Sequence, residues 1–496
     1  MERRIRALAF VLALVGLASG AASAAEPWPL PPPDACTPSG GRLAPGRPED
    51  ATPLPFQPGD VVGIDRVAVL ANFLPAFFWQ ERERFFFDGM RLEIGPCYRD
   101  YAPPGFYQDA TKAGEGKARL DDEGGLHDYG AGLPFAPARI ALDDPQAGLK
   151  WLWNVEHRYQ GAGFRGRFRL VDLVGRTGRA EPFTGEMFKI LLTHRADRPA
   201  PKYEAANARG NLWVAGGLFF TPFDAREHAW RQYRHVESMT SARRTDDLHA
   251  YLPQWRRVRR ISAANTEGLY MPSFSVGVVQ SQQLPVAAGG AAGAGGAGAV
   301  AGGGAGMAGG GATIQTKRSG FEGLELRPNL YAVRVLGLHD VLAPINLANA
   351  VWPANEDRDF GPWGLSFASD RFELRRALVL EATQREAAEA SETARMTLYV
   401  DLQTLHPLYV ATFDTDGEMT NVGVYASRWS EDRPDYPRWP DDPGREVRVL
   451  DPAGAAFANL AESGSWRRES WELVSTPPSD DEVKRMISTV QLTKRH

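Results

Sequence analysis

Residues 249–261 read HAYLPQWRRVRRI. The pattern predicts a strand over 248–252, a turn at Pro253 and Gln254, and a second strand that begins at Trp255, because proline lacks a backbone donor and suits a turn. Successive side chains of a strand point to opposite faces, so the second strand carries arginines on both of its faces. A core strand has at least one apolar face. The guanidinium groups of this hairpin therefore need an explanation of their own.

Apolar residues recur with a period of two on both sides of this hairpin. Phe164, Phe168 and Leu170 alternate with arginines at 165, 167 and 169, and residues 186–192 alternate in a similar way. Further strand-like runs lie at 212–221, 227–236, 370–385, 394–401, 405–413 and 419–425, and strands resume at Tyr331 after a break. Successive strands joined by short turns indicate an antiparallel meander. The expected fold class is therefore mainly β with flanking helices.

Helices are expected at the two ends of the domain. One begins at Asp60, and a second segment, 76–87, carries aromatic side chains that include Phe77, Phe78, Trp79 and Phe85. This second segment is either a helix packed into the core or a mobile plug over an apolar cavity. Residues 479–482 read SDDE, a capping box that predicts a closing amphipathic helix within 476–496.

The beginning of the chain has the pattern of an export signal. Arg3, Arg4 and Arg6 precede an apolar run over 7–18, and small residues at 22–24 offer a cleavage site, so we expect a signal peptide over 1–24. A Pro-rich leader follows over 25–59. No later stretch is long and apolar enough to predict a membrane helix. These features predict an exported, periplasmic protein that is soluble or peripheral to the outer membrane.

Only two cysteines are present, Cys36 and Cys97. In an oxidising compartment the simplest prediction is a disulfide between them, and the alternative is two buried free thiols. On the chain-entropy model, closing a loop of this length contributes about 4 kcal/mol.

Composition and motifs exclude several classes of protein. The chain has 496 residues and a net charge of −5, which argues against a nucleic-acid partner. It contains no nucleophile elbow, zinc-protease motif, Cys-x-x-Cys, phosphate loop or dinucleotide fingerprint. We therefore predict a protein without catalytic activity, metal or cofactor. Residues 60–475 are expected to form one large β-rich domain, interrupted by a flexible Gly/Ala-rich insert over 287–312.

Several short blocks occur together, in order, in one bacterial family. They are 131–135 (AGLPF), 153–154 (WN), 251–260 (YLPQWRRVRR), 320–323 (GFEG), 342–346 (LAPIN), 371–376 (RFELRR) and 398–401 (LYVD). In this combination the chain resembles domain-of-unknown-function family 1329, over most of residues 60–429. The chain departs from the family in its Gly/Ala insert, in its length and at Arg375, where the family often has histidine.

The resemblance implies a fold and a function. Members of the family look related to the LolA/LolB carriers, which implies a strongly curved antiparallel sheet, a half-open barrel, with helices covering its concave face. It implies a periplasmic carrier of lipid, lipoprotein acyl chains or another hydrophobic ligand, which works in transport to or maintenance of the outer membrane. Its partners would be an inner-membrane efflux-type transporter or an outer-membrane acceptor. The alternatives are a non-catalytic adaptor of such a transporter and, with less support, a periplasmic hydrolase.

A site for acyl chains needs apolar surface and a few polar groups at its rim. The expected cavity or lid residues are Phe77, Phe78, Trp79, Phe85, Tyr251 and Trp255. The expected rim arginines are Arg257, Arg259, Arg371 and Arg375. These arginines either bind an acidic headgroup in a bidentate manner or pair with carboxylates such as Glu373 and Glu381 to stabilise the sheet.

Overall fold

The computed structural model describes residues 28–36, 54–141, 143–173, 181–205, 207–253, 256–261, 268–271, 273–275, 313–315, 325–352, 358–385, 393–461 and 466–493. The expected signal peptide, most of the leader, the Gly/Ala insert and Trp255 lie outside these residues.

One large sheet dominates the described part of the chain. Its strands are β1 Val61–Val62, β2 Leu92–Cys97, β5 Gln160–Leu173, β6 Glu181–Leu191, β7 Asn211–Thr221, β8 Ala229–His235, β9 Asp247–Leu252, β10 Arg257–Ile261, β13 Tyr331–Ala343, β14 Arg371–Gln384, β15 Arg395–Asp401, β16 Pro407–Phe413, β17 Met419–Trp429, β18 Leu450–Asn459 and β19 Trp466–Val474. Two further pairs of short strands, β3 Arg119–Leu120 with β4 Leu126–His127 and β11 Ser273–Ser275 with β12 Thr313–Gln315, stand apart from it.

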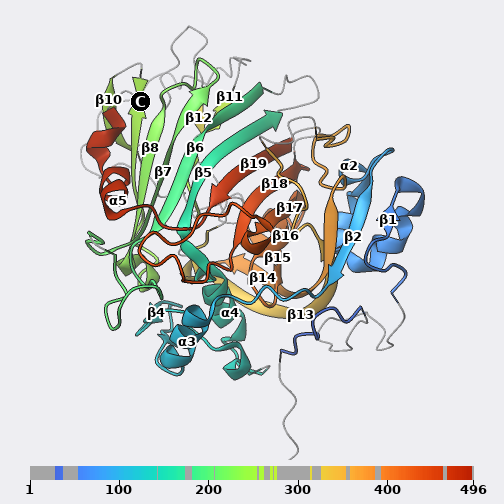
Figure 1. Cartoon of the computed structure of the whole chain (residues 1–496), viewed down its shortest axis with the longest axis horizontal. Helices are drawn as coiled ribbons and strands as arrows, with labels where there is room; N and C mark the ends of the chain where they lie inside the picture. Colours follow the sequence, from blue (N-terminus) through green and yellow to red (C-terminus); the bar gives the residue numbers. More distant parts are fainter. Residues whose placement is uncertain are drawn as a thin grey trace, which may run out of the picture.

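The strand order joins two antiparallel meanders. Strands β5 to β10 form one meander and β14 to β19 the other, and β19 pairs with β5 to connect them (Figure 1). The sequence of pairs is an open path and is not closed into a barrel. The expected fold class, mainly β with a strongly curved and half-open sheet, is confirmed.

One strand pair departs from the expected antiparallel arrangement. Strand β15 pairs with β14 only from Ala377 onward, so the first residues of β14 are free to pair with another strand. Strand β2 occupies this position and runs parallel to β14. The sheet is therefore mixed.

Helices are few and short. The α-helices are α1 Ala76–Gln80, α2 Arg82–Phe85, α3 Gly105–Gly114, α4 Ala147–Glu156 and α5 Asp480–Met486. The 3-10 helices are η1 Ile64–Phe73, η2 Pro137–Arg139, η3 Val236–Met239, η5 Pro328–Leu330, η6 Ser430–Asp432 and η7 Thr489–Thr493. In the described part of the chain, none of the helices combines the length and apolar character that a bilayer span requires.

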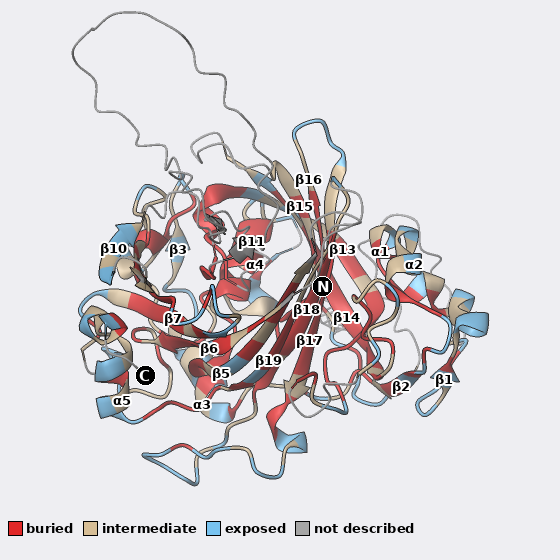
Figure 2. Ribbon diagram, turned by 90° about the horizontal axis from the view of Figure 1, so that it is seen from above, coloured by how far each residue is buried: buried red, intermediate tan, exposed pale blue. Residues whose placement is uncertain are grey.

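Helix α4 fills the concave side of the sheet (Figure 2). A Cβ at Gly148 would lie 2.3 Å from the carbonyl oxygen of Val333 in β13, so only glycine permits this close approach. At the other end of α4, Oε1 of Glu156 lies 3.4 Å from Nη1 of Arg234 in β8. Eight strands separate β14, the partner of β13, from β8 in the strand order. The sheet must therefore curve round α4, whose Trp151 and Trp153 are fully buried.

A second core covers the outer face of β14 to β18. Ala455 and Phe457 of β18 belong to the core around α4, whereas the alternate residues Ala456 and Ala458 belong to the second core. Helices η1, α1 and α2 pack into this second core. The structure thus corrects the expectation that the aromatic helices close the concave side, because that space is already occupied by α4 and its two tryptophans.

The hairpin formed by β9 and β10 lies at one end of the sheet. Strand β10 is the last in the strand order and pairs only with β9. Arg257, Arg259 and Arg260 are exposed, and Arg260 forms an ion pair with Asp247. Charged residues on an edge strand discourage pairing with another chain. This position explains why neither face of the strand is apolar.

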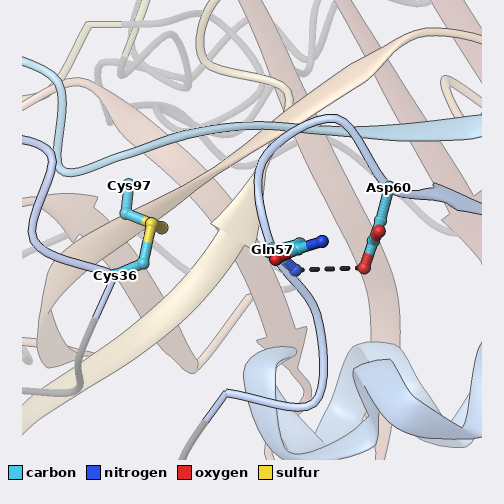
Figure 3. Close-up of a disulfide and its surroundings, with 4 residues drawn as sticks. All are labelled: Cys36, Gln57, Asp60 and Cys97. Atoms are coloured by element: carbon cyan, nitrogen blue, oxygen red, sulfur yellow. Dashed lines mark hydrogen bonds between the residues drawn. A yellow bond between two sulfur atoms is a disulfide. The ribbon is translucent and has the colours of Figure 1, made fainter.

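The predicted disulfide between Cys36 and Cys97 is present (Figure 3), with the two Cα atoms 5.2 Å apart. Cys97 is the last residue of β2, so the bond attaches the described leader segment 28–36 to the sheet. The same leader segment is also held by Trp28, whose Nε1 donates a hydrogen bond of 2.6 Å to the carbonyl oxygen of Ile140.

Candidate functional site

The four aromatic residues expected to form a lid are parts of a packed core. Phe78 stacks on Phe85 with ring centroids 4.2 Å apart, and it meets Tyr409 of β16 edge-on at 4.9 Å. Phe77 is partly buried and lies edge-on to Tyr399 at 5.7 Å. Trp79 is also partly buried in this cluster. These contacts match the interpretation of the segment as a core helix.

The other expected ligand residues lie far from these helices. Tyr251 of β9 is half-buried and pairs with Ala229 and Val258. Arg257 and Arg259 lie on the exposed edge strand β10. Trp255 lies outside the described residues. In the strand order β9 and β10 are at the opposite end of the sheet from β14 and β2. The structure therefore does not bring the expected lid and this part of the expected rim together.

The two arginines of β14 are engaged within the protein. Arg375 is buried and donates to both carboxylate oxygens of Asp401, at 2.7 and 3.2 Å. Arg371 donates from Nε and Nη2 to the carbonyl oxygen of Asn346, at 3.2 and 3.0 Å. Both guanidinium groups thus stabilise loops against the sheet, in line with the structural interpretation of the rim arginines.

A space large enough for a ligand lies on the outer face of the meander formed by β5 to β10. It is a partly open groove of about 530 Å³ between the sheet and the C-terminal elements α5 and η7. In Figure 1, α5 lies beside β8 and β10, at the opposite end of the sheet from β1 and α2. Small-molecule sites commonly have volumes of about 300–1,000 Å³. The groove is therefore large enough for a ligand.

Strand register defines the floor of the groove. Arg165 of β5 lies between Val474 of β19 and Phe188 of β6, and Phe188 pairs onward with Gly216 of β7. The adjacent row places Arg167 between Glu472 and Glu186, and Glu186 pairs with Leu218. The alternate residues of β5, Phe164 and Phe168, point into the core around α4. The floor therefore carries the polar alternation of β5 together with apolar side chains of its neighbours.

The C-terminal segment forms a wall of the groove. Val483 of α5 is buried against the outer face of β6 and β7, in a small core that includes Phe188 and Ile190. Met486 and Leu492 contribute apolar side chains to this wall. Two hydrogen bonds fasten this segment to β8: Nε of Arg231 donates to the carbonyl oxygen of Met486 at 2.6 Å, and Oη of Tyr233 donates to that of Ile487 at 2.7 Å.

The lining of the groove is basic although the whole chain is acidic. Five arginines line it, against two glutamates: Arg165, Arg167, Arg231, Arg433 and Arg485, with Glu186 and Glu472. Burial lowers the pKa of Arg231 to about 10, and its guanidinium lies 4.9 Å from the centre of the Phe188 ring. A groove whose lining combines apolar side chains with an excess of arginines suits a ligand that is mainly apolar and carries negative charge.

A second, much smaller cavity of about 40 Å³ lies beside the end of α4. It is lined by buried charged groups that include Glu156, Lys189 and Glu325, with Nζ of Lys189 2.5 Å from Oε1 of Glu325. Burial, together with the charge of Glu325, raises the pKa of Glu156 to about 8. This volume has room for a few water molecules and excludes a lipid chain. We interpret the cluster as a structural network.

No cluster of three or more His, Cys, Asp or Glu side chains suited to a metal ion occurs within the described ranges. Two histidines pair with carboxylates, His127 with Asp121 and His235 with Asp247, each at 2.7 Å. Neither pair lines the groove.

The model of the family described as "Protein of unknown function (DUF1329)" matches residues 84–273 and 306–442. The chain is a member of the DUF1329 family. In this DUF1329 protein the matched ranges include β5 to β8 but end before β18, β19 and α5. The sheet floor of the groove thus lies largely within the family region, whereas its C-terminal wall lies beyond it. No curated protein matches the sequence of this DUF1329 member.

Two solved structures are distantly similar to this DUF1329 protein. One is a DUF1329 family protein from Desulfovibrio piger, with 11% identity, coverage of 71% of this chain and 99% of that chain, and a TM-score of 0.39. The other is a LolA superfamily protein from Nitrosomonas europaea, with 10% identity, coverage of 68% and 96%, and a TM-score of 0.31. Both TM-scores lie below 0.5, so neither likeness carries a functional argument.

Proposed function

We propose that the protein is a periplasmic binding protein that carries a hydrophobic ligand, with the groove under α5 and η7 as its binding site. The observation that supports this proposal is the groove itself: about 530 Å³ of space, with Phe188, Leu218, Val474, Met486 and Leu492 among the lining residues. Leu218, Val474 and Met486 are only partly buried, and an apolar ligand would remove the rest of their surface from water, which is favourable.

The export signal expected from the sequence supports a periplasmic location for this activity. A carrier there would bind lipid or lipoprotein acyl chains and serve transport to or maintenance of the outer membrane. On the concave side, α4 and its buried tryptophans pack into the core round which the sheet curves. The ligand would therefore bind on the outer face.

Native mass spectrometry followed by lipid extraction tests this function. The full-length protein is purified without detergent, beside two variants that each add a bulky ring. Leu218→Trp fills the floor of the groove, and Val61→Trp places the same ring on the exposed end strand β1, where Val61 is 41% exposed. We expect wild type and Val61→Trp to retain extractable lipid and Leu218→Trp to lose it.

The competing function, an adaptor that binds an envelope transporter without a ligand, gives the opposite result. Wild-type protein would then be free of lipid under every purification condition, and capture of the transporter would be unaffected by Leu218→Trp. Either an empty wild-type protein or full lipid content in Leu218→Trp would contradict the carrier function assigned to this groove.

A further inference from the structure

Among the five arginines of the groove, Arg165 is the half-buried one without a partner among the described residues. Arg167 donates to Glu472 at 2.5 and 2.9 Å, and Nη1 of Arg433 donates to Asp451 at 2.6 Å. Arg231 donates to the carbonyl oxygens of Met486 and Trp230. Arg165, in contrast, has no hydrogen bond or ion pair with a residue that the structure describes, and its buried Nε has no acceptor there.

The position of Arg165 makes this lack of a partner costly. Its register neighbours across the outer face are Val474 on one side and Phe188 on the other, so the cation lies between apolar side chains. A half-buried guanidinium is normally paired with an anion, because partial removal from water disfavours the isolated charge. Arg165 therefore lacks an anionic partner, and a ligand that carries an anion would supply one.

A second arginine strengthens the positive field at the same place. Arg485 of α5 lines the groove and is exposed, with no ion pair within 4 Å among the described residues. Arg165 and Arg485 both act electrostatically on Glu482. Oε2 of Glu482 is already engaged with the backbone N–H and the hydroxyl of Ser479 in the capping box of α5. Glu482 thus serves the helix start, and among the described residues no ion pair within 4 Å joins it to either arginine.

The two carboxylates that line the groove, Glu186 and Glu472, interact with arginines other than Arg165. Glu472 is engaged by Arg167. Glu186 is the register partner of Arg167, and its charge acts on Arg231. Neither carboxylate neutralises Arg165, so the positive charge of the pair Arg165 and Arg485 faces the groove.

We propose that the ligand of the groove is an anionic amphiphile, whose carboxylate or phosphate head binds Arg165, with support from Arg485, and whose apolar tail lies over Phe188 and Leu218. This inference rests on the proposed function and names its ligand class. Leu218 of β7 lines the groove and is only half-buried, so its apolar side chain is available to the tail.

The experiment compares an acid with its neutral ester. The fluorescent fatty acid cis-parinaric acid and its methyl ester share one tail and differ only in the charge of the head. Each is titrated into delipidated wild type, Arg165→Gln, Arg165→Lys and the control Arg243→Gln, which changes an exposed arginine outside the groove. Thermal unfolding of every variant verifies that it is folded.

The expected result is a selective loss. Arg165→Gln should weaken binding of the acid by at least about tenfold, because a charge-assisted hydrogen bond is removed, and should leave binding of the ester unchanged. Arg165→Lys keeps the charge but loses the planar fork, so we expect an intermediate affinity. Arg243→Gln should bind both probes as wild type does.

The outcomes separate the two proposals. If wild type binds both probes but Arg165→Gln leaves the ratio of acid to ester affinity unchanged, the headgroup site is wrong and the groove remains a binding site. If wild type binds neither probe, the carrier function itself fails. A further titration with inorganic phosphate distinguishes the source of the anion. If inorganic phosphate displaced the acid and bound as tightly as the acid does, the groove would be a site for a free anion. The proposal of an amphiphilic ligand would then be wrong.

Discussion

Arg231 of β8 and Met486 of α5 are joined by a hydrogen bond of 2.6 Å, although 255 residues separate them in the sequence. The bond holds the end of a helix of seven residues against the sheet and so maintains the wall of the groove. A helix this short is not stable alone and depends on such tertiary contacts.

Replacing Arg231 by Gln should therefore release the C-terminal segment. We expect local opening of α5 and η7 to become easier by about 1–3 kcal/mol, because a hydrogen bond from a charged donor is lost. Hydrogen exchange measured by mass spectrometry checks this: amides of 480–493 should exchange faster while those of β13 and β14 stay protected. Tyr233→Phe removes the second tether, a neutral one, and should give a smaller effect. Uniform acceleration across the chain would contradict a local role.

The buried ion pair between Lys189 and Glu325 gives a second prediction. Lys189→Met should destabilise the fold by about 3–5 kcal/mol, because Glu325 would remain buried without its partner. The double variant Lys189→Met with Glu325→Leu should recover most of the loss. Urea unfolding measures both. Lys484→Met, which breaks the exposed pair with Asp481, is the control and should leave the midpoint unchanged. Equal midpoints for single and double variants would refute the coupling.

Stability should depend on pH through His406. Burial lowers the pKa of His406 to about 3. The unfolded chain binds a proton near pH 6.5, whereas the folded protein does not, so the contribution of His406 is complete above pH 6.5 and is lost as the pH falls toward 3. The expected slope is about 1.4 kcal/mol per pH unit within this window.

A comparison of wild type with His406→Gln isolates this contribution. Glu156 and Asp451, whose pKa values burial raises to about 8 and about 6, act in the opposite direction but are present in both proteins. Urea unfolding from pH 4 to pH 7 should therefore show a flatter dependence for the variant. Parallel curves would mean that His406 is protonated in the folded protein or already neutral in both states.

The disulfide supplies the fourth prediction. Replacing both Cys36 and Cys97 by serine should lower the free energy of unfolding by about 4 kcal/mol on the chain-entropy model. Wild type in the presence of a reductant should match the double variant. A loss far below this value would indicate that the leader segment is held mainly by other contacts, such as the hydrogen bond from Trp28 to Ile140.

Local patterns in the sequence were sufficient for much of the fold. The alternation at Phe164, Phe168 and Leu170 correctly predicted a strand with one apolar face, and the capping box at Ser479 and Glu482 is present in α5. The disulfide followed from the number of cysteines and the export signal. The strand and the helix cap depend on residues close in sequence, and the disulfide depends on the single possible pair of cysteines.

The pairing of strands far apart in the sequence could be seen only in the structure. The pairing of β19 with β5 joins Trp466 to Leu173, and no local pattern specifies such a partner. The aromatic helix around Phe78 has the same apolar composition whether it covers the inner or the outer face of a sheet. Its location was decided by α4, whose residues around Gly148 approach β13 closely enough to fill the inner side.

The groove was missed for a related reason. The arginines at 165, 167 and 169 were visible in the sequence as the polar face of a strand, which is ordinarily solvated. Their significance depends on the C-terminal segment, which lies more than 300 residues later and covers part of that face. A strand face with arginines at three alternate positions, 165, 167 and 169, was the one available signal. The hairpin at 249–261 drew attention to the edge of the sheet instead.

Photo-crosslinking tests the location of the ligand most directly. A palmitic acid that carries a diazirine in its chain is bound to the full-length protein and activated by light, and the labelled peptides are identified by mass spectrometry. We expect adducts in β5 to β7, β19 and the segment 480–493, with competition by unlabelled palmitic acid. Adducts confined to 76–87, or spread evenly over the surface, would contradict a hydrophobic site in the groove.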